Sequence, residues 1–465
     1  MAVSTARRIA FDVLHRVATQ DAYADELLHA ELDTTIRRDD AGLATELTLG
    51  VLRWQRLLDF QIERHLIHDV KKLDIEVLLA LRLALYQLIF LDRIPARAAI
   101  HESVELVKRA RKRSAAPLVN AVLHKAAQET QREPMLPDTL THLLPTDLPL
   151  ADRLGLVYSH PTWLVERWLS AYGEEHTRSL LTANNRARKL SCWVQDEQHR
   201  EAARESLKRA GCFVSPGRLL REAWTLQGGH PAASKAVQEG WVAIQDEASQ
   251  AVAHLLGVER GDTVLDLCAA PGGKTLLLAR AAGPDGHVVA GDFHQHRLRA
   301  MTERFERAAI RNVECVELDA TQPLPFERPF DRILVDAPCS GTGTLSPHPE
   351  IRWRLRAEDL TDLQARQVKL LRNALLHLAP GGRLVYSTCS LEPEENELVV
   401  QDGLRAEPQE FRIITSSGMI QRVLIDGVPA GSLFSPRGFF RTFPPEHGTD
   451  GFFAAAIERT GSRTP

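Results

Sequence analysis

The stretch from Val264 to Thr275 reads Val-Leu-Asp-Leu-Cys-Ala-Ala-Pro-Gly-Gly-Lys-Thr, and it decides the fold of the second half of the chain. Its first half is apolar and predicts a buried parallel strand. Its second half is small and rich in glycine, which favours a turn, and a helical pattern follows through Ala282. A strand, a glycine turn and a helix N-terminus form a corner where backbone amides approach a ligand closely. The stretch therefore predicts a cofactor-binding site in an α/β domain.

Two commoner cofactor motifs are absent from this stretch. A P-loop requires glycine where the chain has Cys268, and the dinucleotide pattern G-x-G-x-x-G does not occur here. Asp266 lies at the carboxyl end of the predicted strand, where an acid can hold a polar ligand. Asp292 ends the next apolar run, about 20 residues after the glycines, which is the usual place for an acid that accepts hydrogen bonds from ribose. A ribose-bearing cofactor without a bound pyrophosphate fits this pattern, and S-adenosyl-L-methionine is the predicted cofactor.

The composition limits the class of protein. A length of 465 residues suffices for two or three domains, and hydrophobic and charged fractions of 44% and 25% are typical of a soluble protein. Because the net charge is −4, any nucleic-acid binding has to come from local patches. The six cysteines form no C-x-x-C pair, and we recognise no secretion signal and no membrane-spanning run. We expect a cytoplasmic protein that uses no metal and enters no membrane.

The first part of the chain is helical throughout. From Ala6 to about Thr130 apolar residues recur at helical spacing, which predicts an all-α domain over residues 1–132. Pro95 is predicted to open one of its helices. The domain carries a basic run: Lys108, Arg109, Arg111, Lys112 and Arg113. Such a run often contacts RNA phosphates, whereas the alternative is a solvated helix end favoured by the helix dipole, and the sequence leaves the two interpretations balanced.

The remaining chain is predicted to divide into three parts. Prolines mark a linker over residues 133–150, and short mixed patterns predict a small α/β module over residues 151–240. Over residues 241–460 apolar runs alternate with helical segments, which predicts a mostly parallel, doubly wound, Rossmann-like sheet. A fifth run ends at Ser387, and a late run, Phe452–Ile457, predicts a final edge strand. The first four runs end at acids, namely Asp266, Asp292, Asp319 and Asp336.

Two cysteines follow the fourth and fifth of these runs. Cys339 lies in Asp336-Ala-Pro-Cys and Cys389 in Ser-Thr-Cys-Ser, and both contexts are small and turn-forming rather than typical of a buried structural cysteine. Methylation of carbon 5 of cytosine needs a thiolate that adds to carbon 6, an acid near ring nitrogen 3 and a base for the carbon 5 proton. The two cysteines and Asp336 supply these groups. Methylation of an amino group uses no thiol and a Pro-Pro-aromatic segment, which the chain lacks at this place.

Several segments resemble the signature blocks of the bacterial RNA cytosine-5 methyltransferases, namely Cys268–Thr275, Asp336–Gly343, His348–Trp353 and Tyr386–Ser390. The helical front half resembles the RNA-binding antitermination factor NusB, and this combination resembles the 16S rRNA methyltransferases of the family. The resemblance implies that Cys389 is the nucleophile and that Cys339 assists release of the methylated product, a choice that the residues alone leave open. It also implies cofactor contacts, largely through the backbone, from Cys268, Ala269, Ala270, Pro271, Gly272, Gly273 and Lys274.

The resemblance implies further contacts from three acids. Asp292 is expected to bind ribose, Asp319 to lie near adenine, and Asp336 to face both the methyl donor and the target base. Asp319 has an alternative role as the cap of the following turn, and Lys274 has one as a surface residue of the helix.

The predicted substrate is a specific cytosine in 16S rRNA, free or early in assembly, and the predicted enzyme is a monomer. Because the base has to leave its stack to meet Cys389, single-stranded or incompletely folded RNA is favoured. The same chemistry on tRNA or at another rRNA site is one alternative, and a non-catalytic RNA-binding assembly factor is another. The joint presence of Asp336, Cys339 and Cys389 disfavours a non-catalytic relic. A DNA methyltransferase is disfavoured because no target-recognition insertion follows Cys389.

Overall fold

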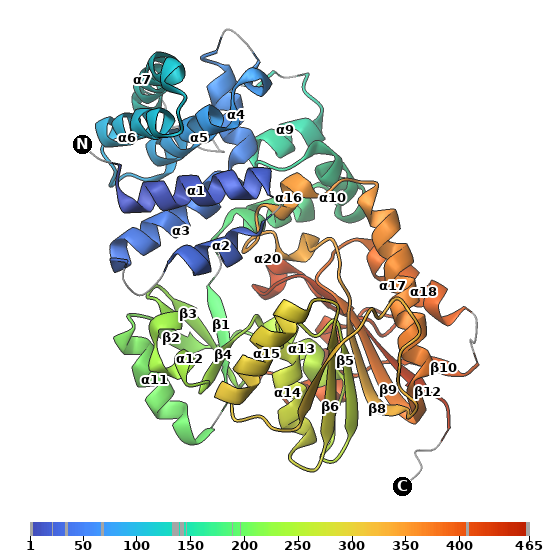
Figure 1. The fold of residues 1–465 in the computed structure, drawn as a ribbon. Coiled ribbons are helices and arrows are strands. Elements are labelled where there is room, and N and C mark those ends of the chain that lie inside the picture. The colour runs from blue at the N-terminus through green and yellow to red at the C-terminus, as the bar shows by residue number, and fades with distance from the viewer. Residues whose placement is uncertain are drawn as a thin grey trace. The chain divides into compact units, whose positions relative to one another are not determined.

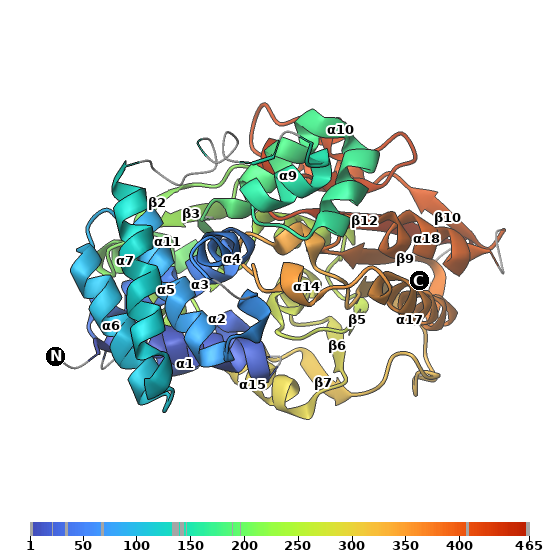
Figure 2. The ribbon, with the colours of Figure 1, turned by 90° about the horizontal axis from the view of Figure 1, so that it is seen from above.

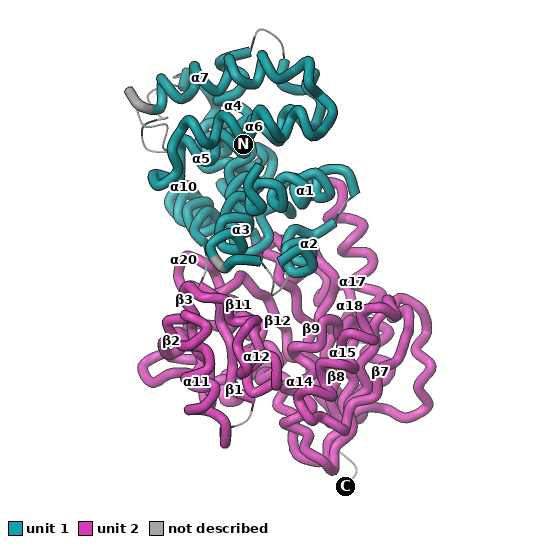
Figure 3. The backbone as a smooth tube through the Cα atoms, turned by 60° about the vertical axis from the view of Figure 1, so that its left-hand side comes forward, with its two compact units in different colours: residues 1–187, 345–357 teal, residues 188–344, 358–465 magenta. Residues whose placement is uncertain are grey.

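The structure is a computed structural model (Figure 1; Figure 2 gives the view from above), and it describes residues 3–20, 22–32, 36–66, 69–132, 139, 144–145, 147–187, 189–195, 197–405 and 409–461. The chain forms two compact units (Figure 3). Unit 1 comprises residues 1–187 and 345–357, and unit 2 comprises residues 188–344 and 358–465. A short segment from the second half of the sequence therefore packs with the helical first half.

Unit 1 is helical, as the spacing of its apolar residues predicts. The most apolar of its helices, α5, is buried on nearly every side, and Pro95 directly precedes α6 as expected. The helices of unit 1 are α1 (Thr5–Thr19), α2 (Ala24–Glu31), α3 (Arg38–Arg53), α4 (Gln55–Glu63), α5 (Ile75–Phe90), α6 (Ala96–Arg109), α7 (Ala116–Arg132), α9 (Leu150–Val157), α10 (Thr162–Asn185) and α16 (Ile351–Arg354).

A buried arginine fastens residues 345–357 into unit 1. Arg352, in α16, is 0% exposed, and burial lowers the pKa of its guanidinium. Trp353 adds a bond from its indole nitrogen to the carbonyl of Leu52, at 2.6 Å. Backbone carbonyl oxygens compensate the positive charge of the buried guanidinium. Because these carbonyls come from three separate parts of unit 1, the same hydrogen bonds hold the segment in place. The guanidinium donates to the carbonyl oxygens of Arg53 (3.4 Å), Ser159 (3.1 Å), Asn184 (3.2 Å) and Leu345 (3.2 Å) and to Oδ1 of Asn185 (2.9 Å).

Unit 2 contains a small antiparallel sheet in the order β2-β3-β1-β4. Its strands are β1 (Leu190–Val194), β2 (Phe213–Pro216), β3 (Ala223–Gln227) and β4 (Val242–Ile244), packed with α11 (Arg200–Arg209) and α12 (Lys235–Gln238). Short apolar patterns at Leu190–Val194 and Ala223–Leu226 predict β1 and β3. The sequence misses β2 and β4 because four and three residues are too few to show an alternating pattern.

The larger sheet of unit 2 has the order β10-β12-β9-β8-β5-β6-β7, and β11 pairs with β12. Its strands are β5 (Thr263–Leu267), β6 (His287–Asp292), β7 (Val313–Glu317), β8 (Phe330–Asp336), β9 (Leu378–Thr388), β10 (Phe411–Ile414), β11 (Phe440–Thr442) and β12 (Phe452–Arg459). Strands β5 to β9 pair in parallel. The prediction of an edge strand at Phe452–Ile457 is wrong, because β12 pairs with β9 on one side and β10 on the other.

Helices cover both faces of this sheet, which confirms the predicted fold class. On one face α13 (Glu247–Leu255), α14 (Gly273–Ala282) and α15 (Gln295–Arg307) cover residues such as Val264, and on the other α17 (Asp359–Leu376) and α18 (Glu397–Leu404) cover residues such as Leu265 (Figures 1 and 2). Successive side chains of a strand point to opposite faces of the sheet. Because helices cover both faces, the residues that point to either face are apolar. The shorter helices of unit 2 are α19 (Ser417–Gln421) and α20 (Pro444–His447).

The strand order reverses at β5. The chain runs from β5 to β6 and β7 on one side and then returns to β8 and β9 on the other. Ligands of such sheets bind at the carboxyl ends of the strands beside this reversal. The carboxyl ends of β5 and β8 are Leu267 and Asp336, so the predicted cofactor corner and the predicted catalytic acid lie at the same edge of the sheet.

The predicted linker lies largely outside the described residues, since 133–138, 140–143 and 146 are not among them. The other predicted domain boundaries stay predictions. Among the helices that the structure describes, none combines the length and apolar character needed to cross a bilayer.

We predict that Arg352→Ala destabilises unit 1 by about 3 kcal/mol or more, because it removes several charge-assisted hydrogen bonds and leaves a cavity. Chemical denaturation followed by circular dichroism measures the effect. The exposed Arg97→Ala is the matched control and should unfold like the wild type. An Arg352→Ala variant as stable as the wild type would show that the buried guanidinium does not hold the segment.

We predict that Asp266→Asn gains stability relative to the wild type as pH rises. Burial raises the pKa of Asp266 to about 7, whereas an unfolded aspartate titrates near about 4. The protonated carboxyl therefore contributes stability that is complete below about pH 4 and is lost as pH rises through about 7. Thermal unfolding of the cofactor-free protein between about pH 5 and pH 8 measures the difference. A difference that does not change with pH contradicts the raised pKa.

Candidate active site

The loop between β5 and α14 is shaped by two residues with positive φ. Cys268 has φ 61° and Gly272 has φ 86°, and α14 starts at Gly273. A Cβ atom on Gly272 would lie 3.1 Å from ring carbons of Phe305, so this position favours glycine for both conformation and space. The amide of Ala269 donates to the carbonyl of Gly291 at 3.0 Å. The predicted small-residue corner is therefore formed. The amide of Ala269 is used to hold the loop against β6.

Asp292 ties the end of β6 to this loop. Its Oδ2 accepts from the amide of Ala270 at 3.2 Å, and its Oδ1 accepts from the amide of His294 at 3.0 Å. The residue is 8% exposed. A carboxylate has about four acceptor sites, so Asp292 retains capacity for ribose hydroxyls.

Asp266 is a buried acid with an unused acceptor. Its Oδ2 accepts from the hydroxyl of Thr275 at 2.7 Å, and its Oδ1 has no hydrogen-bond partner among the residues that the structure describes. The sequence already indicates Asp266 as a position where an acid can hold a polar ligand. A buried acceptor without a partner next to the loop fits a bound polar ligand.

Asp319 acts as a turn cap in this structure. Its Oδ1 accepts from the amide of Thr321 at 2.9 Å and from its hydroxyl at 2.7 Å, and these hydrogen bonds lower the pKa of the exposed carboxyl. The capping role considered from the sequence is therefore present. The adenine contact stays a prediction.

Lys274 is paired with the predicted catalytic acid. Its Nζ lies 2.7 Å from Oδ2 of Asp336, and its side chain is only 10% exposed, so it is not a surface residue of the helix. Its Nζ also lies 5.0 Å from the ring centre of Phe452. Oδ1 of Asp336 accepts from the hydroxyl of Ser387 at 2.7 Å. Both oxygens of Asp336 thus act as acceptors beside a positive charge.

The two predicted catalytic cysteines lie together. The sulfur atoms of Cys339 and Cys389 are 3.4 Å apart, and both residues carry free, half-buried thiols. The hydrogen bond with Cys389, followed by burial, raises the pKa of Cys339. The raised pKa favours the protonated form of Cys339, and either sulfur can be the donor in this contact.

A buried carboxylate that the sequence did not indicate joins the two cysteine loops. Glu395 is 0% exposed and lies in the short segment Pro393–Glu395 between β9 and α18. It accepts from Ser340, the residue after Cys339, and from Ser390, the residue after Cys389. No periodic pattern or motif indicates it, because its contact with Ser340 spans 55 residues of sequence.

Three of the five basic residues in the predicted RNA-binding run have acidic partners. Lys108 pairs with Glu105 at 2.7 Å, Lys112 with Asp74 at 3.0 Å, and Arg109 with Asp12 at 3.8 Å. Such exposed pairs are weak and compete poorly with phosphate. Arg111 and Arg113 are exposed and form no ion pair within the described residues. RNA contact by this run stays a prediction.

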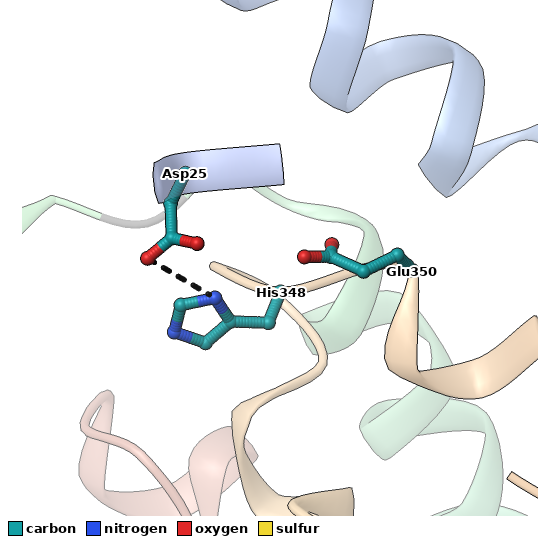
Figure 4. Close-up of side chains that lie close together, drawn as sticks. All are labelled: Asp25, His348 and Glu350. Carbon is teal, nitrogen blue, oxygen red and sulfur yellow. Dashed lines mark ion pairs between the residues drawn. The ribbon is translucent and has the colours of Figure 1, made fainter. Parts of the chain in front are cut away.

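Among the residues that the structure describes, three in unit 1 are candidates for holding a cation. Asp25, His348 and Glu350 offer ligand atoms within 4.8 Å of one another and point toward a common space (Figure 4). Nδ1 of His348 lies 3.8 Å from Oδ2 of Asp25, and Oε2 of Glu350 is buried without a partner in the described chain. Ligand atoms of a tetrahedral zinc ion lie roughly 3.3 Å apart. The cluster is a histidine–aspartate contact beside a buried carboxylate, and the prediction that the protein uses no metal stays a prediction.

Both halves of the chain match known protein families. Residues 253–458 match the family described as 16S rRNA methyltransferase RsmB/F, residues 4–128 match the NusB family, and residues 160–233 match the ferredoxin-like domain of RsmF/B-like methyltransferases. The crystal structure of PH0851 is similar over 97% of this chain and 97% of its own, with a TM-score of 0.78 and 25% identity. A methyltransferase homologue from Pyrococcus horikoshii covers 67% of this chain and 99% of its own, with a TM-score of 0.56 and 27% identity.

Curated relatives match over most of the length. The probable ribosomal RNA small subunit methyltransferase B of Bacillus subtilis is 33% identical over 99% of this chain and 100% of its own. The ribosomal RNA small subunit methyltransferase B of Pseudomonas putida is 35% identical over 89% of this chain and 93% of its own. With the cofactor corner and the methyltransferase sheet in place, the chain therefore belongs to the RsmB/F family of S-adenosyl-L-methionine-dependent 16S rRNA methyltransferases.

Proposed function

We propose that the protein methylates carbon 5 of a specific cytosine in 16S rRNA through a covalent adduct with Cys389. The observation that carries the proposal is the 3.4 Å approach of the Cys339 and Cys389 sulfur atoms at neighbouring strand ends. Asp336, at the end of one of these strands, is paired with Lys274. Amino-group methylation has no use for two such thiols.

Cys389 carries out the attack. Because the pKa of Cys339 is raised, Cys339 keeps its proton and its S–H stabilises the thiolate of Cys389. The Cys389 sulfur forms a bond to carbon 6 of the cytosine, and the electrons of the ring double bond move to carbon 5 and toward ring nitrogen 3. The ammonium group of Lys274, held by Asp336, provides the positive charge that offsets this developing negative charge.

The cofactor residues of the chain fit S-adenosyl-L-methionine. Small residues line the loop, Asp292 has acceptor capacity for ribose, and Asp266 presents a buried oxygen without a partner among the described groups. When bound, S-adenosyl-L-methionine supplies the electrophilic methyl group that carbon 5 accepts.

Cys339 completes the reaction. Once the Cys389 sulfur is bonded to carbon 6 it is neutral, so the interaction that most raises the pKa of Cys339 is weakened. Cys339 can then lose its proton to solvent, and its thiolate takes the proton from carbon 5. The electrons of that C–H bond restore the ring double bond, and the bond between carbon 6 and Cys389 breaks.

The substrate follows from the relatives. The curated relatives that match nearly the whole chain are named as small-subunit rRNA methyltransferases, which favours 16S rRNA over tRNA or another rRNA site. We infer that the RNA is free or early in assembly and that the enzyme acts as a monomer. A non-catalytic assembly factor is disfavoured because the cysteine pair and the Lys274–Asp336 pair are both fully formed.

We predict that Cys389→Ala abolishes methyl transfer to a 16S rRNA transcript, whereas Cys339→Ala accumulates a protein–RNA adduct that survives denaturants. The first change removes the nucleophile, and the second removes the group that releases it. Labelled cofactor and denaturing gels measure both outcomes. Cys315→Ala, in β7, is the control and should retain activity. Full activity of Cys389→Ala would contradict the assigned nucleophile.

We predict that Asp292→Ala weakens binding of S-adenosyl-L-methionine by at least about tenfold, because it removes a charged acceptor and loosens the loop at Ala270. Isothermal titration calorimetry measures the affinity. The exposed Asp285→Ala provides the control. Unchanged affinity in the Asp292→Ala variant would show that this carboxylate takes no part in cofactor binding.

A further inference from the structure

Glu395 uses both carboxylate oxygens on the two cysteine loops. Its Oε1 accepts from the amide of Ser340 at 2.8 Å and from Nε2 of Gln367 at 3.0 Å. Its Oε2 accepts from the hydroxyl groups of Ser340 and Ser390, whose oxygens lie 3.0 Å apart. One buried carboxylate thus contacts the residue that follows each cysteine.

The surroundings of Glu395 hold it in place. The hydroxyl of Tyr386, in β9, donates to the carbonyl of Glu395 at 2.6 Å. Asn396 donates to the carbonyl of Ser390 at 2.9 Å and accepts from the hydroxyl of Thr388 at 2.5 Å. The segment after β9 is therefore fastened to the strand that carries Cys389.

The same network reaches the loop of the other cysteine. Gln367, in α17, donates through Nε2 both to Glu395 and to the carbonyl of Pro338, at 2.8 Å. Pro338 directly precedes Cys339. The peptide before Cys339 is held by Gln367, which is hydrogen-bonded to Glu395, and the peptide after Cys339 donates to Glu395 directly.

We propose that Glu395 is a positioning residue that sets the separation of Cys339 and Cys389 and so permits attack by one and release by the other. The proposal rests on the two-cysteine chemistry proposed above. Glu395 does not meet the reactants, because it is fully buried and its oxygens are occupied by Ser340, Ser390 and Gln367. Its negative charge also raises the pKa of Cys339, which supports the proton placement that the reaction needs.

The test uses Glu395→Gln in the full-length protein, with the exposed Glu327→Gln as the matched control. Gln keeps the shape but removes the negative charge and replaces one acceptor oxygen by an amide donor, so one set of these hydrogen bonds loses its carboxylate acceptor. We expect the single-turnover rate of methyl transfer to fall about 100-fold, the cost of a small misplacement of reacting groups, while the affinity for S-adenosyl-L-methionine stays within about twofold of the wild type. Unchanged methyl transfer in Glu395→Gln would overturn the proposal.

A second readout isolates the attack step. In the Cys339→Ala background, adduct formation on 16S rRNA reports attack by Cys389 alone, and Glu395→Gln should slow it in protein that remains folded at the assay temperature. Normal adduct formation would overturn the positioning role. If Glu395→Gln does not fold, the Ser340→Ala/Ser390→Ala variant replaces it, since it keeps the carboxylate and removes its two hydroxyl partners. That variant should show the same slow attack, and a wild-type rate would overturn the proposal.

Two results separate this proposal from the proposed function. If the wild type forms no adduct and no 5-methylcytosine, the proposed function fails, whatever Glu395 does. If the wild type is active and Glu395→Gln equals it, only the positioning role fails. In a double-mutant cycle the losses from Glu395→Gln and from Ser340→Ala/Ser390→Ala should combine to less than their product, because both changes break the same hydrogen bonds. Fully multiplicative losses would contradict a shared network.

Discussion

The parallel pairing of β8 with β9 is the constraint on which the active site depends. The register of this pair places Asp336 opposite Ser387, so the two strands end side by side. Cys339 follows Asp336 by three residues, and Cys389 follows Ser387 by two. Neither thiol needs a long loop to reach the other. The reversal of strand order at β5 places the cofactor loop at the same edge, and Lys274 connects this loop to Asp336 across the strand ends. The reacting groups are therefore positioned mainly by strand pairing.

Three buried ionisable groups, two in unit 2 and one in unit 1, are accommodated in different ways. Asp266 has one partner and a pKa raised to about 7 by burial, so it is poised to accept either a proton or a polar ligand. Glu395 is buried with donors on both oxygens, which makes it the structural centre of the two cysteine loops. Arg352 is surrounded by backbone carbonyls and fastens a segment of the second half of the sequence into the helical unit. Each solution follows from the cost of burying charge without hydrogen bonds.

Much of the architecture could be predicted from the sequence because it is local. The stretch 264–275 predicts strand, turn and helix, and strand ends at Asp292 and Asp336 appear as predicted. The approach of Cys339 and Cys389 also follows from parallel strand ends. The burial of Glu395, the anchoring of Arg352 and the inner position of β12 could not be predicted, because each depends on partners far away in the chain. A periodic pattern in the sequence does not show which distant residues become partners. Strand β10, which pairs with β12 on its outer side, is short and partly exposed, so the sequence does not indicate it as the edge strand.

The most direct measurement of the central claim identifies the sulfur that binds the base. A 16S rRNA transcript containing 5-fluorocytosine traps the adduct, since fluorine at carbon 5 cannot leave as a proton. Tryptic digestion separates the cysteines, because Cys389 falls in the peptide 384–405 and Cys339 in the peptide 333–352. Mass spectrometry should find the nucleotide on Cys389. A nucleotide on Cys339, or no covalent product from an enzyme that methylates ordinary RNA, would contradict the account.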